Sequence, residues 1–190
     1  MFIRKKFFYL AIICFIYLFL AINYERSDST LKQMEQEVVA AATKTGVYQG
    51  NLAEDFQLIT TSGEKRKLSN FRGKKVIVNF FATWCGPCQE EMPILVELDK
   101  RTSKEQMIIL GVNVTKEESS PTQVRDFMKQ FQVQFDVLYD GDGEVMKTYQ
   151  LIGIPTTIFI DDKGKIVERL NGIITMEMIE THPFFKGMPH

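Results

Sequence analysis

Two kinds of hydrophobic pattern divide the chain. Residues 7–22 form an apolar run without a charged residue, whereas from residue 52 onward short apolar stretches alternate with polar ones. Residues 76–81 are β-branched and aromatic on both faces, which predicts a central strand covered on each side. Residues 107–114 predict a second buried strand. The alternating part of the chain is therefore expected to be one compact α/β domain.

Helices and hairpins are predicted around these strands. Residues 92–104 and 121–131 carry apolar residues at helical spacing, the second with a proline in its first turn. Antiparallel strand pairs are expected within 56–68 and 156–170, and a closing helix at 176–181. Strands that alternate with helices and end in a hairpin give a mixed central sheet with helices on both faces.

The apolar run at 7–22 predicts a transmembrane signal-anchor. Its length is close to the roughly 20 residues that span a bilayer as a helix. It ends without the small residues of a cleavage site, which disfavours a cleaved signal peptide, and a buried core helix is a third interpretation. Because Arg4, Lys5 and Lys6 precede it, the rest of the chain is expected on the extracytoplasmic face of a bacterial cytoplasmic membrane.

Three segments follow from these patterns. Residues 1–26 are expected to be a cytoplasmic tip and transmembrane helix, residues 27–50 a stalk or linker, and residues 51–190 the α/β domain. Cys14 falls within the anchor, where a cysteine behaves as a small apolar residue.

Composition and charge narrow the function. The 190 residues are 45% hydrophobic, enough for a sizeable core. Lys and Arg number 23 against 24 Asp and Glu, so no strongly basic face is implied and nucleic acid is not an expected partner. Three cysteines and two histidines are too few for a disulfide-rich miniprotein or a multi-ligand zinc domain.

The candidate chemistry lies in one motif, Trp84-Cys85-Gly86-Pro87-Cys88, between the central strand and the next helix. At a helix N-terminus the Cys85 sulfur meets unpaired N–H groups and the positive end of the helix dipole. Both stabilise a thiolate and lower its pKa. Cys88, one turn into the helix, is placed to attack a mixed disulfide. Pro87 fixes the backbone between the cysteines, and Gly86 leaves the approach open.

Three other interpretations of this cysteine pair are weaker. A zinc site needs further ligands, and the only histidines, His182 and His190, lie near the C-terminus. Covalent haem attachment requires a histidine after the second cysteine, where Gln89 stands. A structural disulfide with so short a loop would add little stability. Redox exchange is the favoured chemistry, and neither a metal nor a cofactor is expected.

The sequence resembles a known family at this point. Residues 76–93 look like the thioredoxin active site, and with Ile154-Pro155-Thr156-Thr157 and the anchor the chain is similar to the membrane-tethered ResA/TlpA-like family. The resemblance covers roughly residues 51–175 and implies a thioredoxin fold. The chain between the motif and Pro155 is longer than in thioredoxin, and the surplus is expected around residues 115–143 as a central insertion.

The resemblance also implies roles for individual residues. Cys85 becomes the attacking and Cys88 the resolving cysteine of a redox-active disulfide. A cis peptide bond is implied before Pro155, beside the disulfide, with the backbone of Ile154 pairing to the substrate chain. The implied substrate-binding residues are Trp84, Gly86, Pro87, Ile154 and Pro155.

Two departures from cytosolic thioredoxin concern proton transfer. Asn79 stands where cytosolic thioredoxins hold a buried aspartate, and an asparagine cannot accept the proton of Cys88. Glu91, three residues after Cys88, matches a glutamate that the ResA-like branch ties to active-site protonation. Helical spacing puts it on the same face as Cys88, so it is a candidate catalytic residue. The alternative is an ordinary first-turn glutamate favoured by the helix dipole.

Other functions of the thioredoxin fold need residues that this sequence does not carry at the matching positions. A thioredoxin-fold peroxidase relies on a Pro and a Thr seven and three residues before its cysteine, where Val78 and Ala82 stand. A copper chaperone needs three residues between its cysteines and a ligand histidine in the domain. A membrane-tethered holdase or scaffold, using the apolar surface near Trp84 and Pro155, is a non-enzymatic alternative.

The direction of electron flow is expected to be reductive. Gly-Pro between the cysteines is typical of reducing thioredoxins and adds no polar group that would make a strong oxidant. The resemblance implies exported disulfide substrates, either apocytochrome c before haem attachment or spore-envelope assembly proteins. It also implies a polytopic membrane protein that carries electrons from cytosolic thioredoxin. An extracytoplasmic disulfide oxidase or isomerase is the alternative.

Overall fold

The computed structural model describes residues 15–20, 23–24, 32, 34 and 44–186. The chain divides into two compact units, Met1–Thr43 and Lys44–His190. Among the described residues, no helix has the length and apolar character needed to cross a membrane. The predicted anchor and stalk lie largely outside the described residues, so they stay predictions.

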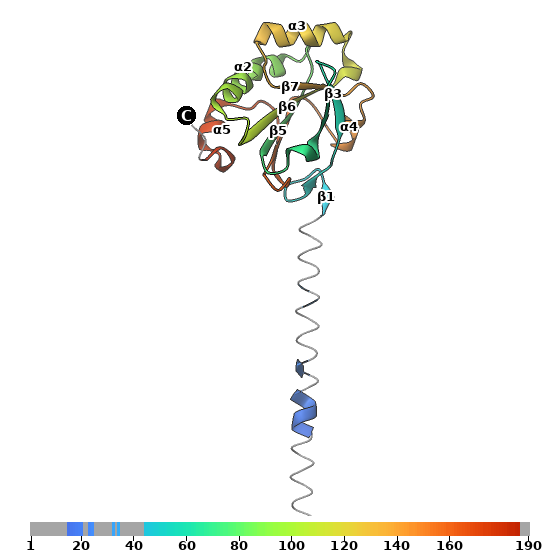
Figure 1. The fold of residues 1–190 in the computed structure, drawn as a ribbon, viewed down its shortest axis with the longest axis vertical. Coiled ribbons are helices and arrows are strands. Elements are labelled where there is room, and N and C mark those ends of the chain that lie inside the picture. The colour runs from blue at the N-terminus through green and yellow to red at the C-terminus, as the bar shows by residue number, and fades with distance from the viewer. Residues whose placement is uncertain (1–14, 21–22, 25–31, 33, 35–43, 187–190) are drawn as a thin grey trace, which may run out of the picture. The chain divides into compact units, whose positions relative to one another are not determined.

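The second unit is built on a mixed seven-stranded sheet (Figure 1). Its strand order is β4-β3-β7-β6-β5-β8-β9. Its strands are β3 (Gln57–Thr60), β4 (Lys65–Lys67), β5 (Lys75–Phe81), β6 (Met107–Asn113), β7 (Asp136–Tyr139), β8 (Thr156–Ile160) and β9 (Ile166–Asn171). Two short strands, β1 (Thr45–Gly46) and β2 (Leu52–Ala53), pair with each other in parallel. The two hairpins and both buried strands match the sequence-based predictions.

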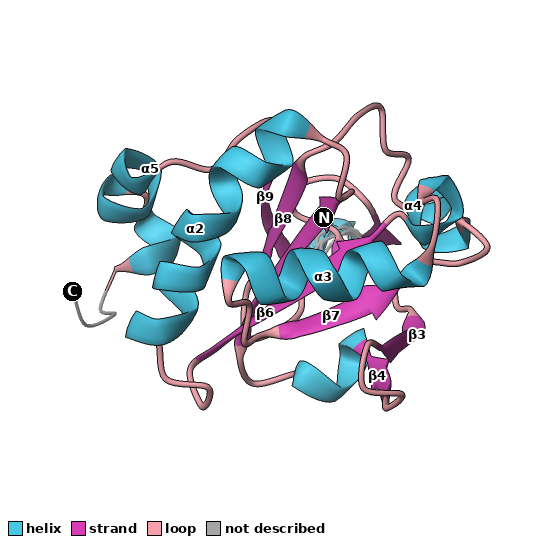
Figure 2. Ribbon diagram, turned by 90° about the horizontal axis from the view of Figure 1, so that it is seen from above, coloured by secondary structure: helices cyan, strands magenta, loops and turns pink. Residues whose placement is uncertain are grey.

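Within residues 44–186, four α-helices and three 3₁₀ turns complete the fold. The helices are α2 (Gly86–Arg101), α3 (Pro121–Phe131), α4 (Glu144–Thr148) and α5 (Met176–Thr181), and the turns are η1 (Leu68–Phe71), η2 (Thr115–Glu117) and η3 (Pro183–Phe185). α2 begins inside the cysteine motif, and α3 and α5 have the predicted bounds. Figure 2 shows α2 and α3 side by side over one face of the sheet.

Strand β5 lies at the centre of the sheet. It pairs in parallel with β6 and antiparallel with β8, and its residues from Val76 onward are buried. Alternate side chains enter two separate cores. Ile77 and Phe81 pack with residues of α2, α3 and η3, whereas Val78 and Phe80 pack with residues of η1 and α4. A strand buried on both faces is apolar at nearly every position, which is why this stretch could be recognised from its composition.

The segment expected to hold the central insertion, around residues 115–143, contains α3 and β7. β7 lies between β3 and β6 in the sheet, antiparallel to β3 and parallel to β6. A Cβ added at Gly111 of β6 would lie 3.1 Å from the Phe135 ring, 3.2 Å from the Phe81 ring and 3.3 Å from the Val137 side chain. The glycine therefore leaves room for side chains from β5 and from the segment that forms β7 on this face of the sheet.

The second unit begins at Lys44, earlier than the domain start expected at residue 51. Val47 is only 3% exposed, and the N–H of Gly50 donates to the carbonyl of Ile166 at 2.8 Å. Residues 44–50 are thus part of this unit, held by burial and by a backbone hydrogen bond to β9. No apolar periodicity marked this short segment.

We predict that Leu110→Ala lowers the free energy of unfolding by about 2–5 kcal/mol, because Leu110 is fully buried in β6 and its removal leaves a cavity. Ile59→Ala on β3, where the side chain is half-exposed, should cost less than about 1 kcal/mol. Urea unfolding of both variants measures the difference, and equal losses would contradict this account of the core.

Candidate functional site

The cysteine motif joins the end of β5 to the start of α2. Cys85 is the N-cap residue of α2 and forms a disulfide with Cys88, with 5.2 Å between the Cα atoms. The Cys85 sulfur also accepts the backbone N–H of Cys88 at 3.2 Å. Cys85 is 5% exposed and Cys88 is fully buried. The Cys85 sulfur is thus the one nearer to solvent, and it lies where the N–H groups of the helix stabilise a negative charge.

The segment before β8 reaches the disulfide from the other side. The bond between Ile154 and Pro155 is cis, as the family resemblance implies. The carbonyl oxygen of Ile154 lies 3.8 Å from the Cys85 sulfur, which carries no proton in the disulfide state. The antiparallel pairing of β8 with β5 brings Ile154 beside Cys85, which is 69 residues away in sequence.

An exposed surface surrounds the buried cysteines. The Trp84 side chain is 56% exposed, and its indole N–H donates to the carbonyl of Glu117 at 3.1 Å. Gly86 and Pro87 are exposed, and a Cβ added at Gly86 would meet no atom within 4 Å. Ile154 is half-buried and Pro155 is buried beside them, so the exposed rim near the Cys85 sulfur is formed by Trp84, Gly86 and Pro87.

Glu91 is fully buried behind the disulfide, on α2. One carboxylate oxygen accepts the amide of Asn79 at 2.7 Å, and the other accepts the backbone N–H of Ile174 at 3.0 Å. Burial raises the pKa of Glu91 to about 7, although both hydrogen bonds act to lower it. A carboxyl group with this pKa gains and loses a proton near neutral pH, which an exposed first-turn glutamate would not do.

Asn79 lies on β5 and supports Glu91 without titrating. Its amide nitrogen donates to the Glu91 carboxylate and to the hydroxyl of Thr157 at 3.0 Å. Within the part of the chain that the structure describes, the Asn79 side-chain oxygen is buried with no hydrogen-bond partner. An amide turned by 180° would offer this oxygen to a protonated Glu91, so the pair can accommodate both states of the carboxyl group.

Sequence reasoning did not find Thr157, Ile174 or Glu118 near this site. The Ile174 contact spans 83 residues, and the Glu118 carboxylate accepts the backbone N–H of Thr83 across 35 residues. Thr157 belongs to the proline motif, but its hydrogen bond to Asn79 depends on the register of β8 against β5. Contacts of this range leave no periodic signal in a single sequence.

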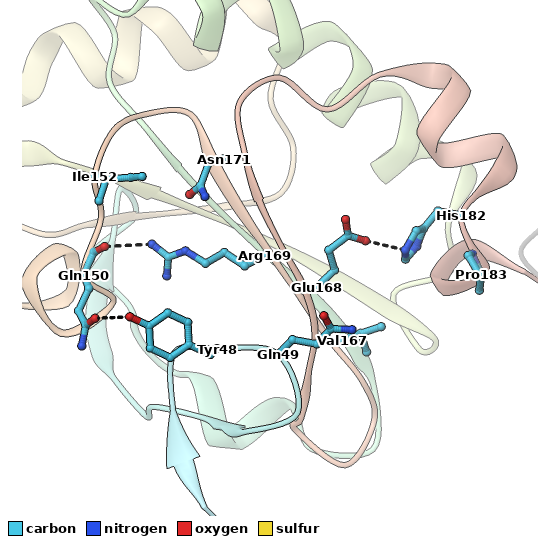
Figure 3. A pocket seen from close by; sticks show the side chains of 10 residues that line it. All are labelled: Tyr48, Gln49, Gln150, Ile152, Val167, Glu168, Arg169, Asn171, His182 and Pro183. Atoms are coloured by element: carbon cyan, nitrogen blue, oxygen red, sulfur yellow. Dashed lines mark hydrogen bonds and ion pairs between the residues drawn. The ribbon is translucent and has the colours of Figure 1, made fainter.

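A groove of about 1020 Å³ adjoins the proline segment (Figure 3). The Arg169 guanidinium donates to the carbonyls of Tyr149 and Gln150 at 2.7 and 3.1 Å, and so holds the chain that leads to Pro155. The groove is lined by Tyr48, Gln49, Gln150, Ile152, Val167, Glu168, Arg169, Asn171, His182 and Pro183. Ile152, one of the lining residues, is 87% exposed.

Known proteins share both the sequence and the fold. The pattern of the AhpC/TSA family matches residues 49–169. The thioredoxin-like protein YneN of Bacillus subtilis is 39% identical over 137 residues, covering 72% of this chain and 79% of that protein. The thiol-disulfide oxidoreductase ResA of Geobacillus kaustophilus is 38% identical over 139 residues, covering 73% and 78%. The two positions that a peroxidase would need are occupied by buried Val78 and Ala82.

Solved structures share the fold of this chain. StoA from Bacillus subtilis has a TM-score of 0.59 at 32% identity, covering 67% of this chain and 94% of that one. A putative thiol:disulfide interchange protein DsbE from Chlorobium tepidum has a TM-score of 0.60 at 27% identity, covering 71% and 90%. With a disulfide at the N-terminus of α2 beside a cis proline, the chain belongs to the AhpC/TSA family as a thioredoxin-like thiol-disulfide oxidoreductase of the ResA type.

Proposed function

We propose that this protein reduces disulfides of exported proteins on the extracytoplasmic side of the membrane, to which residues 1–26 tether it. The observation that carries the proposal is the Cys85–Cys88 disulfide at the N-terminus of α2, with the Cys85 sulfur 3.8 Å from the Ile154 carbonyl. The apolar run at 7–22 and the basic residues before it support the location. The Gly86-Pro87 pair between the cysteines supports the reductive direction.

Exchange proceeds in two displacements. The Cys85 thiolate attacks one sulfur of a substrate disulfide, so a mixed disulfide forms and the other substrate sulfur leaves as a thiolate. The Cys88 thiolate then attacks the Cys85 sulfur, which restores the Cys85–Cys88 disulfide and releases the second substrate thiolate. Two electrons pass to the substrate, and a donor dithiol must return two electrons before the next cycle.

Glu91 is the proposed acceptor of the Cys88 proton. Cys88 is fully buried and must lose its proton before the second displacement. Glu91 lies on the same face of α2 one turn later, and its pKa of about 7 suits a group that takes and returns a proton near neutral pH. Asn79 and Ile174 hold the carboxylate in place.

The rim around Cys85 is the proposed substrate-binding surface. Trp84, Gly86 and Pro87 offer an exposed edge, while Ile154 and Pro155 present backbone groups beside the sulfur. A polypeptide in extended conformation can pair with the Ile154 backbone and so bring its disulfide to Cys85. The family resemblance favours apocytochrome c before haem attachment, or spore-envelope assembly proteins, as substrates. It favours a polytopic membrane protein as the electron donor.

We predict a reduction potential near or below about −230 mV for the Cys85–Cys88 pair, the range of reducing thioredoxins. Equilibration of the purified full chain with glutathione or with reduced thioredoxin measures it. A value above about −180 mV would instead place the protein with disulfide oxidases or isomerases and would overturn the proposed direction.

We predict that Cys88→Ser accumulates mixed disulfides with exported proteins, because the second displacement is lost while Cys85 still attacks. Non-reducing gels and mass spectrometry of the trapped species identify the partners. Cys85→Ser is the matched control and should trap none. Trapping of cytosolic proteins alone would contradict the proposed location, and full function of Cys85→Ser in cells would favour the holdase.

We predict that the oxidised protein loses stability as the pH rises from about 4.5 to about 7. The pKa of Glu91 is raised in the fold, so its stabilising contribution is complete below 4.5 and disappears as the buried group ionises near 7. Glu91→Gln should flatten thermal stability over this interval, and Glu90→Gln, an exposed neighbour, should leave it unchanged. An unaltered pH profile in Glu91→Gln would show that Glu91 does not titrate there.

A further inference from the structure

The segment after β6 carries a carboxylate that reaches the active-site loop. One oxygen of Glu118 accepts the backbone N–H of Thr83 at 2.7 Å and the side-chain amide of Asn113 at 2.8 Å. The other oxygen accepts the Thr83 hydroxyl at 2.6 Å. Three donors thus converge on one partly buried carboxylate, two of them from the residue immediately before Trp84.

The rest of this loop is held by neighbouring groups. The carbonyl of Thr83 accepts the side-chain amide of Gln89 on α2 at 2.8 Å, so all three polar groups of Thr83 are paired. The indole of Trp84 donates to the carbonyl of Glu117, the residue before Glu118. The loop is therefore fixed from α2 on one side and from the segment around η2 on the other.

The carboxylate is itself anchored to the end of the sheet. Asn113, the last residue of β6, is fully buried, and its side-chain oxygen accepts the Thr115 hydroxyl at 2.9 Å. The N–H of Val114 donates to the carbonyl of Phe81 at the end of β5 at 3.0 Å. Because β5 and β6 are adjacent strands, the end of the sheet fixes the position of Glu118. Glu118 in turn fixes Thr83 through its hydrogen bonds.

We propose that Glu118 is a positioning residue for thiol–disulfide exchange with protein substrates. It contacts neither cysteine and acts through Thr83, whose fixed backbone holds the Trp84 indole on the rim beside Cys85. An exposed aromatic side chain that is already held loses less conformational freedom when a substrate binds. Glu118 therefore favours the capture of large polypeptide substrates, whereas a small disulfide that reaches Cys85 directly gains little from it. The proposal rests on exchange activity alone and is independent of location and direction.

The test compares two substrates with the full chain and its Glu118→Ala variant. We expect kcat/KM for insulin reduction to fall about tenfold, mainly through KM, because hydrogen bonds to a charged group are lost. The rate with the small aromatic disulfide dithiobisnitrobenzoate should stay within about twofold of the parent. Trp84 is the single tryptophan of the chain, so acrylamide quenching of its fluorescence should increase in the variant.

Three further variants separate positioning from charge and from folding. Glu118→Gln keeps an acceptor for Thr83 and Asn113, so its insulin kinetics should return to within about threefold of the parent. Thr83→Ala removes one of the three hydrogen bonds, so it should give an intermediate loss even if Glu118→Ala fails to fold. Glu105→Ala removes the same charge from an exposed residue before β6 and is the matched control, with parent kinetics expected.

Three results would overturn the proposal. The first is an equal loss with insulin and with the small disulfide, which would assign Glu118 to the chemistry of Cys85 or to the fold. The second is unchanged insulin kinetics or unchanged Trp84 quenching in Glu118→Ala. The third is a Glu118→Gln variant as slow as Glu118→Ala, because charge rather than hydrogen-bond geometry would then be responsible.

Discussion

Strand β5 is paired on both edges and buried on both faces, so its carboxyl end cannot move without disturbing two cores and two neighbouring strands. The cysteine motif begins three residues after this end, and Cys85 caps the helix that follows. A nucleophilic sulfur needs a fixed relation to the helix N–H groups that stabilise its charge. Because β5 is rigid, the Cys85 sulfur keeps a fixed position relative to these N–H groups, and the other groups of the site lie around the sulfur.

The same strand carries the residue that holds the Glu91 carboxylate. Asn79 points from β5 to Glu91 on α2 and to Thr157 on β8, so one amide connects three elements of the site. A buried acid next to a neutral amide retains a pKa near 7, because burial raises it more than the hydrogen bonds lower it. An aspartate in place of Asn79 would put two carboxyl groups in the same buried space, and like charges would oppose the ionisation of both.

The rim around the Cys85 sulfur has a different origin. Trp84 follows β5, Ile154 and Pro155 precede β8, and the carbonyl that holds the indole belongs to Glu117 after β6. These segments meet because β6, β5 and β8 are neighbours in the sheet. The parallel strands β5 and β6 end where the antiparallel strand β8 begins. α3 and β7 follow Glu117 in the chain.

The amino-acid sequence alone determined the α/β class, the two buried strands, the two hairpins, three of the helices, the redox motif and the glutamate three residues after it, whereas β1, β2 and α4 were not predicted. These features are local, because periodicity, β-branched runs and a helix-opening cysteine pair are visible within a few turns of chain. The pairing of Asn79 with Glu91, the N–H of Ile174 and the reach of Glu118 to Thr83 were decided only by the tertiary structure. The start of the compact unit at Lys44 was also decided there, by burial of Val47. The physical reason is the same in each case, since hydrogen bonds and burial between residues 12 to 83 positions apart depend on strand order and register, which leave no trace in local pattern.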